Sequence, residues 1–134
     1  MAKNYSVKLR NALKLQLIRG RGVLKHGVIG PICPICNHFG GSMDMHEVLI
    51  TRGDLSGSPV QYAIMVAENC VLVHHEDCHH NAATTEGQAQ CVRHLISYEG
   101  YDNIRNWLIE MDDLMKGNQA LHALRLLKEI YYGD

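Results

Sequence analysis

Two short clusters of cysteine and histidine constrain the fold of this 134-residue chain more than any other feature. The first is Cys33-Pro-Ile-Cys36, whose spacing lets two thiolates bind one tetrahedral zinc ion. The second, His75-Glu-Asp-Cys78, begins 39 residues after Cys36 and offers one more thiolate and an imidazole. Together the two clusters predict a structural zinc site with four ligands: Cys33, Cys36, His75 and Cys78.

Other interpretations of these residues stay open. A CxxC pair can be redox-active, but such a pair usually begins a helix after a strand, and no strand-like segment precedes Cys33. His74 adjoins the second cluster and is an alternative to His75 as the zinc ligand. Cys70 is a weaker candidate ligand and, like Cys91, is expected to be buried. The His-rich segment could also serve one structural zinc, with its spare histidines in solvent.

A metal site would compensate for a small hydrophobic core. The length fits one domain, and the chain contains only one Phe and one Trp, so large aromatic side chains for a core are scarce. The sequence shows neither a secretory signal nor an apolar run of the roughly 20 residues that a membrane helix needs. We therefore expect a cytoplasmic protein that does not contact a membrane. In that reducing compartment, its five cysteines indicate metal binding rather than disulfides.

The charged residues are distributed unevenly, although the net charge is only −1. Seven of the 13 basic residues precede Asp44, which is the first acidic residue, and the remainder of the chain has six basic and 14 acidic residues. This asymmetry favours contact between a basic N-terminal arm and a polyanion such as DNA, although the arm could instead dock on the acidic remainder. Arg52 could clamp a phosphate or simply lie in a surface turn. The candidate DNA-binding residues are Lys8, Arg10, Lys14, Arg19, Arg21, Lys25 and Arg52.

The hydrophobic pattern predicts an α+β fold. Residues 20–32 are rich in glycine and indicate a loop. Apolar residues at helical spacing predict helices at residues 6–19, 85–99, 102–115 and 118–132. Apolar runs between turn residues indicate strand-like segments at 43–51, 60–66 and 69–75. We expect one compact domain with three parts: a basic helix and arm (1–30), a core with both Cys/His clusters (31–99) and a helical extension (100–134).

Three polar residues follow one another in the segment that the two clusters delimit. His46 and Asn69 lie between the clusters, and His79 follows the last cysteine directly. Histidine suits a general base because its pKa lies near neutrality, and phosphodiester hydrolysis also needs a divalent cation. Singly, His46 could be a core residue and Asn69 a turn residue. Their joint order with His79, within the segment that the two clusters delimit, singles the three residues out as a set.

The segments CPIC, MDMHEVLITRG and AENCVLVHHEDCHH together resemble the HNH, or ββα-metal, endonucleases of bacteriophages. The segment TTEGQAQCVRHLISYEGYDNIRNWLIEM is similar to the helical tail of that phage group, so the resemblance covers about residues 31–111. It implies a small ββα-metal core stapled by zinc, in an enzyme that hydrolyses DNA phosphodiester bonds with Mg²⁺ or Mn²⁺. It also implies that DNA is the partner of a monomer or homodimer, encoded by a phage and located in the cytoplasm of its bacterial host.

The resemblance also implies roles for single residues. Asn69 would brace a loop and orient the base. The catalytic set would be His46, Glu47, Asn69 and His79. The ligands of the catalytic cation would be Asp44, His46 and His79.

The chain departs from the family pattern in two places. Many relatives carry Asp-His or His-His where this chain has His46-Glu47. Either His46 is the base, with Asp44 or Glu47 assisting the metal, or His46 is a ligand and Glu47 is the base. The spacing from Asn69 to Cys78 is nine residues, one more than is commonest in the family. A zinc protein that binds DNA without cutting it is the alternative function, and a purely structural zinc protein is a third.

Overall fold

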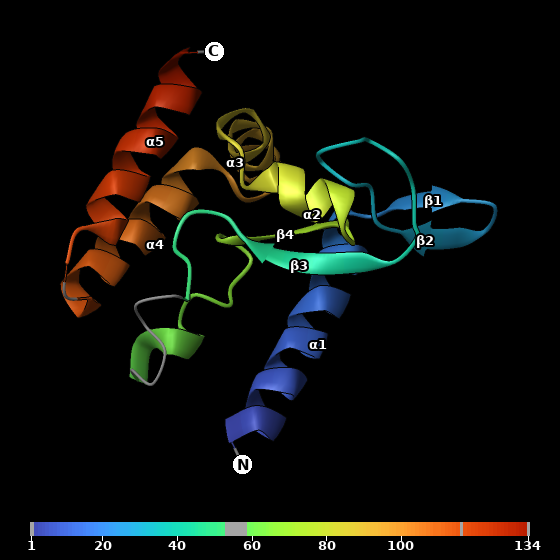
Figure 1. Cartoon of the computed structure of the whole chain (residues 1–134), viewed down its shortest axis with the longest axis horizontal. Helices are drawn as coiled ribbons and strands as arrows, with labels where there is room; N and C mark the ends of the chain where they lie inside the picture. Colours follow the sequence, from blue (N-terminus) through green and yellow to red (C-terminus); the bar gives the residue numbers. More distant parts are fainter. Residues whose placement is uncertain (1, 53–58, 116, 134) are drawn as a thin grey trace.

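The computed structural model describes residues 2–52, 59–115 and 117–133. These residues form five α-helices, four strands and a short 3₁₀ helix, which confirms the α+β class (Figure 1). In chain order the elements are α1 (Ala2–Arg21), β1 (Val23–Lys25), β2 (Val28–Gly30), β3 (Met43–Glu47), η2 (Pro59–Tyr62), β4 (Cys70–His74), α2 (Asp77–Ala82), α3 (Thr85–Glu99), α4 (Tyr101–Leu114) and α5 (Gln119–Gly133).

The centre of the fold is the antiparallel hairpin of β3 and β4, with α2 packed against both strands. The register pairs Met43 with His74 at one end and Glu47 with Cys70 at the other. The residues from Cys70 to Val73 are all buried, because three helices, α1, α2 and α3, contact β4. A strand covered in this way has no solvent face, so its sequence is a continuous apolar run instead of an alternating one.

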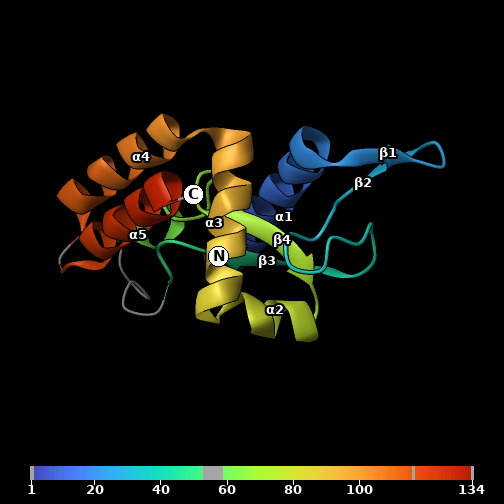
Figure 2. The same cartoon turned by 90° about the horizontal axis from the view of Figure 1, so that it is seen from above.

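Helices α3, α4 and α5 form the other half of the molecule (Figure 2). Thr84 caps α3, since its side chain accepts a hydrogen bond from the backbone N–H of Gly87 at 3.0 Å. Helices α4 and α5 pack against each other through apolar stripes: Ile104, Leu108 and Met111 on α4, and Ala123, Leu127 and Ile130 on α5. The buried core is continuous from α1 to α5.

The N-terminal region differs most from its prediction. Helix α1 is longer than the predicted segment 6–19, and its apolar stripe buries Leu13 and Leu17. The predicted loop 20–32 contains the β1–β2 hairpin instead. The hairpin forms because His26 and Gly27 both adopt positive φ, at 52° and 78°, as a two-residue turn of type I′ requires.

Two strand predictions also need correction. The predicted strand 43–51 ends at Glu47, because Leu49 and Ile50 leave the ladder and donate their backbone N–H groups to Asn69. The predicted strand 60–66 is instead the 3₁₀ helix η2 followed by turns. None of the helices in the described part of the chain has the length and apolar character that crossing a bilayer requires.

Candidate metal centres

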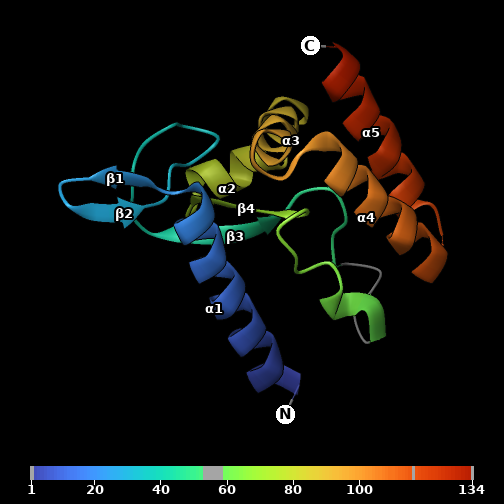
Figure 3. The same cartoon turned by 180° about the vertical axis from the view of Figure 1, so that it is seen from behind.

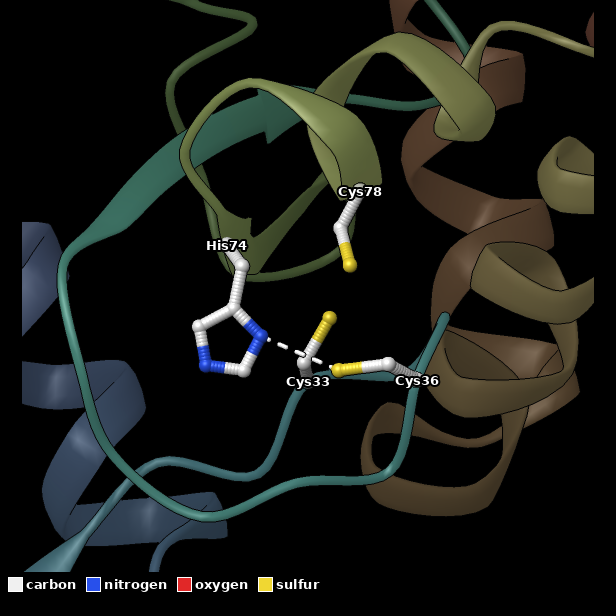
Figure 4. A group of neighbouring side chains, drawn as sticks. All are labelled: Cys33, Cys36, His74 and Cys78. Carbon is white, nitrogen blue, oxygen red and sulfur yellow. Dashed lines mark hydrogen bonds between the residues drawn. The ribbon is translucent and has the colours of Figure 1, made fainter.

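Three cysteines and one histidine converge beside the start of α2 (Figure 4). Their ligand atoms all lie within 4.8 Å of one another. Zinc binds sulfur at about 2.3 Å and nitrogen at about 2.0 Å, so a tetrahedral ion fits among atoms at this separation. The four residues are Cys33, Cys36, His74 and Cys78.

The knuckle between the first two cysteines is shaped by its own backbone. The Asn37 N–H donates to the carbonyl oxygen of Cys33 at 2.8 Å, and the Cys33 N–H donates to that of His38 at 3.1 Å. Asn37 has a positive φ of 63°, a conformation that asparagine tolerates better than most residues. These bonds turn the chain back on itself, so that both sulfurs face the same point.

The thiols of this cluster are poised for a cation. Burial alone would raise the pKa of Cys33, but hydrogen bonds from the backbone of Cys36, His74 and Ile35 outweigh it and lower that pKa to about 7. Burial, together with the neighbouring thiols, raises the pKa of Cys78 to about 12. A cation between the sulfurs would favour their deprotonated form. This donor set could hold a metal ion such as zinc.

His74, and not His75, is the histidine of the cluster, which corrects the predicted ligand set. Its Nδ1 lies 3.0 Å from the sulfur of Cys36, and its Nε2 donates to the carbonyl oxygen of Gly40. That second bond fixes the ring and leaves Nδ1 free for a metal. His75 is directed away because successive side chains at the end of a strand alternate between faces.

The misassignment has a local cause. His74 and Cys78 are separated by three residues, one more than the HxxC spacing that singled out His75. The extra residue is accommodated by Glu76, which adopts a φ of 67° immediately before α2. This conformation is uncommon for a residue with a side chain, and nothing in the sequence announces it.

A second group of polar side chains, which includes His75, lies on one face of the β3–β4 hairpin. Asp44 Oδ2 accepts hydrogen bonds from Nδ1 of His75 at 2.8 Å and from Nδ1 of His79 at 2.9 Å. The rings of His46 and His79 meet edge to face, with their centroids 5.3 Å apart. The group lines an open pocket of about 380 Å³, whose walls are Asp44, His46, His75, Glu76, His79, His80 and Ala83.

Three elements build this pocket, which we call the histidine pocket. Asp44 and His46 are two residues apart on β3 and therefore share one face of the strand. His79 lies on α2, and His75 lies in the turn between β4 and α2. The sequence predicted that Asp44, His46 and His79 would meet, and the structure brings them together. Neither His75 nor His80 was among the predicted ligands of the catalytic cation, because His75 was assigned to the zinc cluster and the pairing of the neighbouring histidines with the two metals was left open.

The electrostatics of the histidine pocket set the charge of each group. The hydrogen bond from His75, and then that from His79, hold the pKa of Asp44 below its ordinary value. The same contact with Asp44 raises the pKa of His75. Burial, and to a smaller extent the charge of His79, lowers the pKa of His46. At neutral pH the pocket therefore contains an ionised carboxylate beside an uncharged His46.

Glu47 does not reach the histidine pocket, which corrects its predicted catalytic place. As the neighbour of His46 on β3 it faces the opposite side, half-buried. Burial raises its pKa, although the charges of Arg52 and Arg10 partly offset the shift. Its buried Oε2 has no hydrogen-bond partner among the described residues. Glu47 is therefore a half-buried acid on the side of β3 away from the histidine pocket.

Asn69 is fully buried and braces the segment that joins β3 to β4. Its Oδ1 accepts from the N–H groups of Leu49 at 2.9 Å and Ile50 at 3.0 Å. Its Nδ2 donates to the carbonyl oxygens of Ile50 at 2.8 Å and Ile64 at 2.9 Å. All four bonds go to backbone groups. Asn69 thus holds the loop at the end of the strand that carries His46.

The candidate DNA-binding residues separate into two groups. Arg21 is 7% exposed, forms a 3.0 Å ion pair with Glu99, and donates to the carbonyl oxygens of Cys70 and Ala67 at 2.8 and 2.7 Å. Arg21 is a structural residue that joins α1 to β4 and α3. The prediction that it contacts DNA is therefore wrong. Two further side chains face inward: Lys14, which donates to the carbonyl oxygen of Met43 at 2.9 Å, and Arg52, which contacts the sulfur of Met65. The residues that remain exposed are Lys8, Arg10, Arg19 and Lys25.

Comparison with known proteins gives no relative for this arrangement. No protein-family model, curated protein or solved structure matches the chain.

Proposed function

We propose that this protein is a metal-dependent endonuclease of the HNH type, which hydrolyses phosphodiester bonds of DNA. The observation that carries the proposal is the meeting of Asp44, His46 and His79 in one open pocket on a strand–strand–helix unit. The adjoining Cys/His cluster, which could hold zinc, supports it, since it ties α2 to the knuckle and so fixes the position of His79.

The donor set of the histidine pocket suits a hard or borderline divalent cation. A carboxylate and neutral imidazoles are ligands for Mn²⁺, and the carboxylate alone suits Mg²⁺. Asp44 and His79 would hold the ion. His75 donates a hydrogen bond to the carboxylate of Asp44. When bound, such an ion would stabilise negative charge on the phosphate and on the departing oxygen.

His46 is the group suited to act as the general base. Its lowered pKa leaves the imidazole unprotonated at neutral pH, ready to take a proton from a water molecule. The water oxygen then forms a bond to phosphorus as the bond from phosphorus to one sugar oxygen breaks. That oxygen leaves with a proton from solvent, and His46 later releases its own. Glu47 has no part in this scheme, since it lies on the other face of β3.

Plasmid nicking tests the proposal directly. We expect supercoiled DNA to be cleaved with Mg²⁺ or Mn²⁺ but not with a chelator, and His46→Ala to lower the rate by about 100-fold or more. His122→Ala is the matched control, because it removes an exposed histidine of α5. Cleavage that survives His46→Ala would contradict the assignment of the base. If no form of DNA is cut with any metal while DNA is still bound, the protein is the non-catalytic DNA-binding protein instead.

A further inference from the structure

The β1–β2 hairpin carries apolar side chains that no described part of the chain covers. Leu24 is 73% exposed and Ile29 is 54% exposed. The two residues are cross-strand partners, so their side chains lie next to each other on one face of the ribbon. Figure 3 shows this hairpin extending from the end of α1, on the opposite side of the molecule from α4 and α5. An apolar pair at an exposed position of this kind marks a binding surface.

The other face of the ribbon is attached to the protein. A methyl group built on Gly30 would lie 2.6 Å from the ring of Phe39, so the backbone there is in direct contact with that ring. The ammonium group of Lys25 lies 5.6 Å from the centre of the same ring. Lys25 and Gly30 alternate with Leu24 and Ile29 along the strands, so they lie on the opposite face. Val28, the partner of Lys25, lies on that face too and is 60% exposed, so the contact with Phe39 anchors this face without covering it.

A tight turn joins the two strands of the β1–β2 hairpin. The turn contains only His26 and Gly27, both in the left-handed conformation that the type I′ turn requires. Two-stranded ribbons are among the elements that proteins place in the major or the minor groove of DNA. Leucine and isoleucine are among the side chains that DNA-bending proteins insert between base steps from the minor groove.

The charge around the hairpin selects DNA over an uncharged partner. Arg19, in the last turn of α1, and Lys25 are both exposed. The first 43 residues include no aspartate or glutamate, so no acidic side chain of this segment would repel a phosphate. Exposed apolar side chains with cations nearby fit a ligand with stacked bases inside and phosphates outside.

We infer that the β1–β2 hairpin is a DNA wedge, in which Leu24 and Ile29 enter the minor groove and unstack a base step. The inference rests on the proposed function and specifies its substrate as duplex DNA that bends when it is bound. Arg19 and Lys25 contact the flanking phosphates. Bending by such a wedge would favour flexible pyrimidine–purine steps near the site of contact.

The test measures DNA binding and unstacking separately from cleavage. A duplex that carries 2-aminopurine is titrated with the full-length protein, without added divalent metal, so that no strand is cut. We expect fluorescence to rise as the base unstacks. The double variant Leu24→Ser/Ile29→Ser should lose that rise and bind about tenfold or more weakly, because it removes the inserted apolar surface. Leu24→Met/Ile29→Leu should retain both signals.

A matched control removes exposed leucines elsewhere. Leu114 and Leu121, which are 60% and 46% exposed at the other end of the molecule, are replaced by serine together, and we expect affinity within about twofold of wild type. Far-UV circular dichroism and zinc content report whether each variant folds. Neither pair lies in the histidine pocket. Plasmid cleavage can therefore be measured in each variant separately from DNA binding.

Four results would overturn the wedge. Equal unstacking by wild type and Leu24→Ser/Ile29→Ser would do so while leaving the nuclease proposal intact, provided that plasmid cleavage persists. A wild-type dimer in solution that the double variant abolishes would identify the hairpin as a self-association surface. Sedimentation of the wild type, but not the double variant, with vesicles of anionic lipid would identify a membrane surface. Failure of the wild type to bind any DNA would reject both the wedge and the nuclease.

Discussion

The Cys/His cluster and the histidine pocket are adjacent, yet they are built in opposite ways. His74 and His75 are consecutive residues, and one enters each site. The cluster is partly buried, and its ligand atoms all lie within 4.8 Å of one another. The histidine pocket is open, and its carboxylate and imidazoles hold one another through hydrogen bonds. The first arrangement suits a permanent structural ion, and the second suits an ion that must also admit a substrate.

Substitution of the two consecutive histidines should reveal this difference most strongly. His74→Ala removes one of four ligands, and we expect it to lose most of the bound zinc and to lower the melting temperature by more than about 10 °C, because metal binding contributes to folding. His75→Ala should keep one equivalent of zinc and melt within about 3 °C of wild type, since its ring is exposed. Elemental analysis and calorimetry make the comparison.

A reversed result would break the comparison. If His75→Ala lost the zinc and His74→Ala kept it, the ligand set would be the one that the sequence predicted. Cys36→Ser serves as the positive control, because a serine hydroxyl is a poor replacement for a thiolate ligand of zinc.

The next largest effect should come from Asn69, which braces the loop that follows the strand carrying His46. Asn69→Ala removes four hydrogen bonds and leaves buried backbone groups of Leu49, Ile50 and Ile64 without partners. We expect the free energy of unfolding to fall by about 3 kcal/mol or more, measured by urea denaturation. Cleavage should also be impaired at temperatures where the variant remains folded, because the loop follows the strand that carries His46.

Asn103→Ala is the control for this prediction. Its side chain also donates to a backbone oxygen, that of Glu99 at 2.8 Å, but it is exposed. Its loss should cost no more than about 0.5 kcal/mol. If the two asparagine variants were equally stable, the bracing role of Asn69 would be rejected.

The same contrast explains how far the sequence could predict the molecule. Cys33, Cys36 and Cys78 were identifiable because they lie in short Cys/His motifs with the spacing of zinc ligands. Asp44, His46 and His79 were identifiable from the resemblance to the HNH pattern. The α3, α4 and α5 helices were identifiable from their apolar spacing. These features depend on short motifs and local periodicity, which a sequence displays.

The errors depend on backbone turns and on burial. The positive φ of Glu76 shifted the zinc ligand from His75 to His74, and the positive φ of His26 permitted a hairpin where a loop was predicted. Arg21 was counted among the DNA contacts because its burial depends on Glu99, a residue 78 positions away. Glu47 was assigned to the active site because it stands where the base lies in the family pattern, although consecutive strand residues face opposite ways.

The smallest predicted effect is a loss of stability at acid pH that comes from His94, near the CxxC knuckle. His94 of α3 lies beside Pro31 and Ile32, which precede the CxxC knuckle, and its ring is 4.9 Å from that of Tyr98. Burial, and then the charge of Arg21, lowers its pKa from 6.5 to about 4. Arg21 is itself paired with Glu99.

The sign of the effect follows from proton uptake. Below pH 6.5 the unfolded chain binds a proton on His94, whereas the folded protein stays unprotonated there down to about pH 4. The free energy of unfolding should therefore decrease as pH falls through this window and be unaffected by His94 above it. Between about pH 7 and about pH 5 we expect a loss of about 1 kcal/mol from this group, after allowance for the partial exposure of the ring.

Urea denaturation of wild type and His94→Gln at both pH values isolates this contribution from that of the histidine pocket. Glutamine does not titrate, so the variant should lose about 1 kcal/mol less than wild type on acidification. His46, whose pKa is also lowered, contributes equally to both proteins and cancels in the difference. Identical pH dependence in the two proteins would mean that the ring of His94 is hydrated in solution, and that the side of the molecule around the knuckle is less enclosed than the contacts of His94 indicate.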